Sequence, residues 1–191
     1  MNSKILLVIF HPYSLLGGAT LSITQLLNKI DKKNYEIVYI CLKSDKSLIL
    51  DKSIKKITIN TSRTIFSINS IRKIIDIYSK KNFRKRIFIS NQNFANVLCP
   101  IILFGNKQFK SILIERNHLD EFKHSNNLVE YVKKNILKAL MKFTYHRTNL
   151  IIGNAKKLSD DLKKYLRVNV KTIYSPSNSK EITRLFNYYM Y

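Results

Sequence analysis

Short apolar runs alternate with amphipathic stretches along the whole chain. Runs with the length and the β-branched or aromatic content of strands cover residues 4–10, 35–42, 56–60, 86–90, 109–114, 149–153 and 168–174. Between them, apolar residues recur at helical spacing, which predicts helices over residues 19–30, 66–78, 94–104, 128–145 and 154–165, and the start of another over 181–191. This alternation is typical of βαβ units. We therefore expect an α/β fold, a Rossmann-like, doubly wound, mostly parallel sheet flanked by helices.

The longest helical pattern, over residues 128–145, has a continuous apolar face. Its spacing places the following side chains on that face: Leu128, Val132, Ile136, Leu140 and Phe143.

The first strand leads into a pair of glycines. Residues 4–10 form a near-continuous apolar run, which suits a central strand covered on both faces. Gly17 and Gly18 then fall at the predicted start of a helix, at the carboxyl end of that strand, where open α/β sheets bind ligands. Free backbone N–H groups and the helix dipole favour an anion there, typically a phosphate. A tight turn that needs glycine's backbone freedom explains the pair equally well, because neither G-x-G-x-x-G nor a Walker lysine is present.

Polar residues also follow the other predicted strands. His11 comes after the first strand, Asn91 after the fourth, and the run Glu115, Arg116, Asn117 and His118 after the fifth. Because the carboxyl ends of parallel strands meet at one edge of a sheet, we expect these side chains to converge although they are far apart in the sequence.

The charge of the chain is strongly positive. The 191 residues are 45% hydrophobic, enough for one domain with its own core, and carry a net charge of +22 from 34 Lys+Arg against 12 Asp+Glu. Such a charge implies attraction to nucleic acid, an acidic membrane or a phosphorylated ligand. Part of it can equally reflect an AT-rich coding sequence. The lysines are spread along the chain, which argues against a dedicated nucleic-acid-binding arm.

Cysteine and histidine spacing gives no sign of a metal site. Cys41 and Cys99 lie inside apolar stretches, so we expect buried, reduced thiols in a cytoplasmic protein. The apolar run near the N-terminus lacks the flanks of a signal peptide, and no segment is long and apolar enough to cross a bilayer.

Five segments, taken in order, carry a family resemblance. They are the strand, GGA turn and helix over 4–27, ISNQNFANVL over 89–98, ILIERNHLDEF over 112–122, NLIIGNAKKLSDDL over 149–162 and VKTIYSPSNSKEI over 170–182. Together they resemble the N-terminal domain of a GT-B glycosyltransferase of family 4. Asn154 and Ser175 stand where that family has serine and asparagine.

The resemblance implies a domain organisation and a reaction. Residues 1–178 would form the acceptor-side domain, and residues 179–191 would begin the connection to a donor-binding domain. The reaction would transfer a sugar from a nucleotide-sugar to a glycan or lipid-linked acceptor, in polysaccharide or cell-envelope glycan synthesis. No cofactor and no essential metal is implied. Because the sequence ends before a donor-binding domain, we expect the chain to be inactive alone and a separately encoded C-terminal half to be a partner.

The resemblance also suggests roles for individual residues. Gly17 and Gly18 would bind the donor diphosphate through backbone N–H groups. The acceptor side would be lined by His11, Asn91, Glu115, Arg116 and Asn117. His118 is the candidate for catalytic proton transfer, with an ordinary loop histidine as the alternative, and His11, which lies closer to the glycines, is its rival. For Glu115 and Arg116 the alternative is a structural ion pair.

Other classes of protein fit parts of the pattern. An inactive truncated remnant and a nucleotide- or cofactor-binding α/β protein of another family share the fold. A basic nucleic-acid-binding module fits the charge alone, and the sequence lacks the aromatic or zinc-ligand signatures of such modules, so we do not expect nucleic acid to be a partner. A cytoplasmic enzyme that contacts the inner face of an anionic membrane peripherally accounts for the charge as well.

Overall fold

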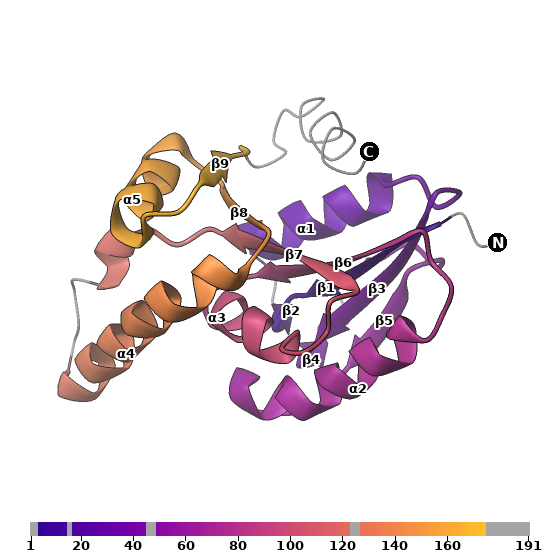
Figure 1. Ribbon diagram of the computed structural model, residues 1–191, viewed down its shortest axis with the longest axis horizontal. Helices are drawn as coiled ribbons and strands as arrows, with labels where there is room; N and C mark the ends of the chain where they lie inside the picture. Colours follow the sequence, from indigo (N-terminus) through magenta and orange to yellow (C-terminus); the bar gives the residue numbers. More distant parts are fainter. Residues whose placement is uncertain (1–3, 15–16, 45–48, 123–126, 175–191) are drawn as a thin grey trace.

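A parallel sheet forms the centre of the structure. The computed structural model describes residues 4–14, 17–44, 49–122 and 127–174 (Figure 1). Within them a seven-stranded sheet has the order β5-β3-β1-β6-β7-β8-β9, and every pair of neighbouring strands is parallel. Its strands are β1 (Ile5–Phe10), β3 (Tyr35–Cys41), β5 (Lys55–Thr58), β6 (Lys85–Asn91), β7 (Phe109–Glu115), β8 (Leu150–Gly153) and β9 (Val170–Thr172). The predicted α/β, Rossmann-like fold is confirmed.

Five α-helices lie on the two faces of this sheet, within the described ranges (Figure 1). They are α1 (Gly18–Lys29), α2 (Ile68–Ser79), α3 (Asn93–Ile102), α4 (Leu128–Thr144) and α5 (Lys156–Leu166). Three short 3-10 turns lie in the connections of the described chain: η1 (Thr64–Ser67) precedes α2, η2 (Leu119–Phe122) follows β7 and η3 (Tyr145–Arg147) follows α4. A second, two-stranded sheet of β2 (Tyr13–Ser14) and β4 (Lys43–Ser44) has no counterpart in the prediction. The predicted helix over 181–191 lies outside the described residues.

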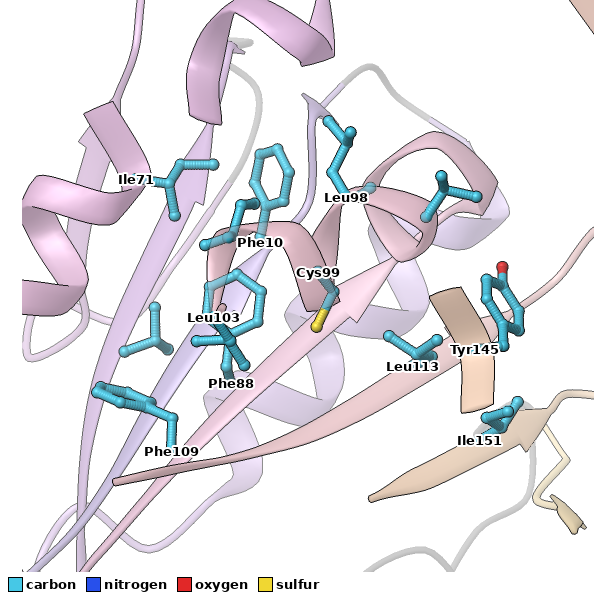
Figure 2. Close-up of a cluster of buried hydrophobic side chains, with 14 of the residues drawn as sticks. Phe10, Ile71, Phe88, Leu98, Cys99, Leu103, Phe109, Leu113, Tyr145 and Ile151 are labelled. Atoms are coloured by element: carbon cyan, nitrogen blue, oxygen red, sulfur yellow. The ribbon is translucent and has the colours of Figure 1, made fainter. Parts of the chain in front are cut away.

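Alternation along the strands divides the core into two layers. In β1, Leu6, Val8 and Phe10 belong to the cluster shared with α2, α3, α5 and part of α4, whereas the residues between them belong to the cluster under α1. Figure 2 shows part of the first cluster, to which Phe88 and Leu113 of the sheet and Cys99 of α3 contribute. Both faces of the central strands are therefore buried from solvent, as expected for a parallel sheet. Cys41 and Cys99 are free and buried, as predicted.

The strand order reverses between β1 and β6. From β1 the chain passes to β3 and β5 on one side, and β6 then pairs with β1 on the other side and starts the second half of the sheet. In open α/β sheets, the crevice at the carboxyl ends of the strands beside such a reversal is where ligands bind.

The apolar face of α4 is turned to solvent. Leu137 and Met141 are the apolar α4 side chains buried in the core. The five residues that the sequence places on one apolar face have exposed fractions between 39% and 76%. Helix α4 therefore packs through its narrower apolar side and leaves the wider one open. No helix in the described part of the chain is long and apolar enough to span a bilayer.

Candidate functional site

Three predicted polar residues meet beside the strand-order reversal. His11 follows β1, Asn91 ends β6 and Arg116 follows β7. All three side chains lie on the face of the sheet that α1 covers. Ile9, Ile89 and Ile114, each two residues earlier in its strand, belong to the cluster under that helix. The alternation of the strands therefore brings these side chains to one point at the carboxyl edge.

A chain of hydrogen bonds joins the three residues. Asn91 Oδ1 lies 2.9 Å from Arg116 Nε, and Asn91 Nδ2 lies 2.9 Å from His11 Nδ1. The guanidinium can only donate, so the oxygen of the Asn91 amide faces Arg116 and its NH2 group donates to His11 Nδ1. The proton of the imidazole is then on Nε2, which lies 3.1 Å from Thr20 Oγ1 of α1. We call these residues, His11, Asn91 and Arg116, the edge cluster.

The environment keeps His11 neutral. Burial, and secondarily the charge of Arg116, lower the pKa of His11 to about 4. At neutral pH the imidazole ring therefore stays neutral. It orients Asn91 through a hydrogen bond and does not exchange protons during a reaction.

Arg116 brings positive charge to the edge of the sheet. Its guanidinium is half-buried, donates to Asn91, and places Nη2 3.3 Å from Ser22 Oγ of α1. Burial lowers its pKa from the ordinary value, but an arginine stays charged at any physiological pH. A partly dehydrated guanidinium held by two neighbours is suited to pair with a carboxylate or phosphate.

Gly17 and Gly18 lie at the start of α1 in an open position. Both are exposed, and the helix has no side-chain cap and no acidic residue in its first turn. Gly17 has a φ of 179°, an extended conformation open to any residue, and a Cβ added at Gly18 would meet nothing within 4 Å. The backbone conformation of Gly17 and the space around Gly18 within the described chain therefore do not require glycine. This favours the interpretation that the open space at these glycines lets a ligand reach the first N–H groups of α1.

Glu115 leaves β7 on the opposite face from Arg116. Its carboxylate is fully buried, accepts hydrogen bonds from Tyr145 Oη at 2.6 Å and Asn96 Nδ2 at 3.2 Å, and caps the Arg116 backbone N–H at 3.1 Å. Burial raises the pKa of Glu115, although these donors act in the opposite direction. The structure does not bring Glu115 to the edge cluster, and its hydrogen bonds tie β7 to α3 and η3.

Asn117 and His118 lie further along the same loop. Asn117 Nδ2 donates to Glu121 Oε2 at 2.7 Å. Asn117 and Glu121 line a pocket of about 320 Å³ together with Phe94 and Lys133. His118 is half-buried just before η2. Among the described hydrogen bonds, those that hold the edge cluster do not include His118. No group of three His, Cys, Asp or Glu residues in the described ranges is placed to hold a metal ion.

The sequence prediction missed the partners that hold these residues. Thr20 lies on the buried side of α1 with Ile23, Thr24 and Leu27, and a polar residue on a core-facing stripe indicates a hydrogen-bond partner. Tyr145, which bonds Glu115 across 30 positions, gives no comparable local signal.

Solved structures of two sugar transferases share this fold. A sucrose-phosphate synthase structure from Thermosynechococcus elongatus matches with a TM-score of 0.58 at 9% identity, covering 97% of this chain and 99% of that chain. An alpha-glucosyltransferase in complex with UDP and a 13-mer DNA containing an HMU base matches with a TM-score of 0.53 at 12% identity, covering 92% of this chain and 43% of that one. The fold is that of one half of a GT-B enzyme. No protein-family model and no curated protein matches the sequence.

Proposed function

We propose that the chain is the acceptor-side domain of a glycosyltransferase that uses a nucleotide-sugar. The observation that carries the proposal is the edge cluster: a guanidinium held by Asn91 lies beside the uncapped, glycine-led start of α1, at the strand-order reversal. The likeness to two sugar transferases supports the fold, and one of those structures contains UDP.

In the proposed reaction, the described residues handle the negative charge of a diphosphate. The first backbone N–H groups of α1 and the positive end of its dipole would face the leaving group, where charge develops as the bond to the sugar breaks. Arg116 would bind a phosphate oxygen of the donor or of an anionic acceptor. The donor's nucleotide would also contact a second domain, which we propose completes the cleft.

The acceptor would lie along the same edge. We propose that Asn117 and the pocket of about 320 Å³ beside it receive part of a glycan or lipid-linked acceptor. Of the two candidate histidines, His118 is the one we propose for proton transfer, because the ring nitrogens of His11 are both engaged and its pKa is about 4. A family 4 assignment, a domain over residues 1–178 and a cytoplasmic location are parts of the same proposal.

Nucleotide binding provides the test. Calorimetric titration of the chain with UDP, ADP, GDP and inorganic pyrophosphate should show saturable binding of at least one nucleoside diphosphate. Arg116→Gln should weaken that binding by about tenfold, because it removes a charge-assisted pair.

A matched control separates the site from the overall charge. Arg84→Gln removes the same charge from an exposed position just before β6, at the amino edge of the sheet, and should leave the affinity within about twofold of wild type. Equal losses in the two variants, or no saturable binding of any diphosphate, would refute the proposed function.

A further inference from the structure

Helix α4 has two apolar sides, and the wider one is uncovered. We call its exposed apolar residues the α4 stripe: Leu128, Val129, Val132, Ile136, Leu140 and Phe143. Leu128 and Phe143, near the two ends of the helix, are 76% and 75% exposed, and Ile136 between them is 54% exposed. At helical spacing these residues point away from Leu137 and Met141, which hold α4 to the core. The stripe therefore runs along the outward side of the helix.

Lysines border the stripe. Lys138 and Lys142 lie one turn apart on α4, with their ammonium groups 5.6 Å and 4.7 Å from the ring centre of Tyr165 in α5. They line a groove of about 680 Å³ between the two helices, and the other basic groups that line it are His146, Lys157, Lys164 and Arg167. Two carboxylates, Asp120 and Asp161, also line this groove, so positive groups outnumber negative ones. The apolar stripe thus adjoins a basic surface.

The apolar stripe and the charge of this surface favour a lipid bilayer. Figure 1 shows α4 at the margin of the molecule. A helix with an exposed apolar side and a lysine-rich flank is the pattern of helices that lie in a membrane interface. Pairing two copies through the stripe would bring two basic flanks together, which like charges oppose. The net charge of +22 also favours an anionic surface.

We propose that α4 docks the protein on an anionic phospholipid bilayer. The α4 stripe enters the boundary between headgroups and acyl chains, and the lysines of the α4–α5 groove contact lipid phosphates. The proposal stands apart from the proposed function, because neither the stripe nor the groove contains a residue of the edge cluster.

Vesicle sedimentation tests the docking face. The wild-type protein should sediment with vesicles of equal parts phosphatidylglycerol and phosphatidylcholine and stay in solution with phosphatidylcholine alone. The double variant Val132→Glu with Ile136→Glu should lower the partition coefficient by about tenfold or more, since two apolar side chains no longer enter the interface. Both side chains are exposed, so the variant should unfold at the wild-type temperature.

A matched variant controls for the change in net charge. Ile65→Glu with Ile77→Glu alters the charge equally at exposed positions on η1 and α2, and should lose less than about threefold in partitioning. If this control loses as much as the α4 variant, total charge and not the stripe drives binding, and the proposal is overturned.

Tryptophan fluorescence locates the contact directly, because the chain contains no tryptophan. Ile136→Trp should shift its emission to shorter wavelength when anionic vesicles are added, whereas Ile77→Trp should not shift. Failure of the wild type to bind anionic vesicles, or binding without a shift at position 136, would overturn the proposal. So would a wild-type dimer that becomes monomeric in the Val132→Glu, Ile136→Glu variant, because the stripe would then be an interface between copies.

Discussion

At the scale of single residues, the imidazole of His11 shows how burial fixes a chemical role. A lone histidine after a strand suggests proton transfer near neutral pH. The structure instead buries it between Asn91 and Thr20. Burial, with the charge of Arg116 as a smaller cause, lowers the pKa of His11 to about 4. His11 is therefore a neutral support for the residues that present charge at the edge.

This environment predicts a pH dependence of stability. The folded-state pKa of about 4 lies below the ordinary value of 6.5, so the unfolded chain binds a proton that the folded chain does not. The contribution is fully present above about pH 6.5 and is lost as the pH falls through about 4, amounting to on the order of 3 kcal/mol. Urea unfolding between about pH 7.5 and about pH 4.5 should show a smaller loss of stability in His11→Gln than in wild type.

Comparison of the two proteins isolates His11, because Glu115, whose pKa burial raises, is present in both. His146→Gln, at an exposed position, should keep the wild-type pH slope. A His11→Gln protein with the wild-type slope would show that His11 is not held neutral in the fold.

Part of the residue-scale arrangement was accessible from the sequence. Because side chains alternate along a strand, adjacent Glu115 and Arg116 point to opposite faces of the sheet. The sequence alone could therefore have indicated that the two residues do not share one site. The bond from Tyr145 to Glu115 could not, because it depends on how η3 packs across the sheet.

At the scale of elements, the packing of α5 on β8 depends on a glycine. A Cβ built on Gly153 would lie 2.5 Å from Ser159 Oγ and 3.2 Å from the Ser159 backbone N. Ser159 is fully buried and its hydroxyl donates to the Ala155 carbonyl. The close approach of strand and helix therefore requires the absence of a side chain at position 153.

Gly153→Ala should lower the free energy of unfolding by about 1–3 kcal/mol, because the methyl group forces α5 away from the sheet. Urea unfolding of Gly153→Ala, Ser159→Ala and the double variant measures the coupling, and the double variant should recover part of the loss. Gly18→Ala is the control: its Cβ would meet open space, so its stability should stay within about 0.5 kcal/mol of wild type or rise slightly. A Gly153→Ala protein as stable as Gly18→Ala would contradict the packing described.

The elements were more predictable than their orientation. Apolar runs located the central strands of the main sheet, because a strand covered on both faces is apolar along most of its length. The strands β2 and β4, of two residues each, are too short to show any period. The sequence also could not predict that the α4 stripe faces solvent, because helical spacing defines an apolar face but not whether that face packs on the core.

At the scale of the whole molecule, the strand order creates the candidate site. His11, Asn91 and Arg116 are separated by up to 105 positions in sequence numbering, and the reversal between β1 and β6 brings them together. The sequence predicted this edge because alternating strands and helices imply a parallel sheet. It did not predict the hydrogen-bond order within the edge cluster, which depends on the register between β1, β6 and β7.

The central claim is that a diphosphate binds where α1 begins beside Arg116. Titration of the isotopically labelled protein with UDP, followed by amide NMR, tests it most directly. The account predicts that the largest shifts fall on the amides of Gly17, Gly18 and Ala19 and on the Arg116 Nε–H, while Gly105, beyond the far end of α3, stays unchanged. Shifts centred on the basic groove between α4 and α5, or no saturable shift at the start of α1, would contradict it.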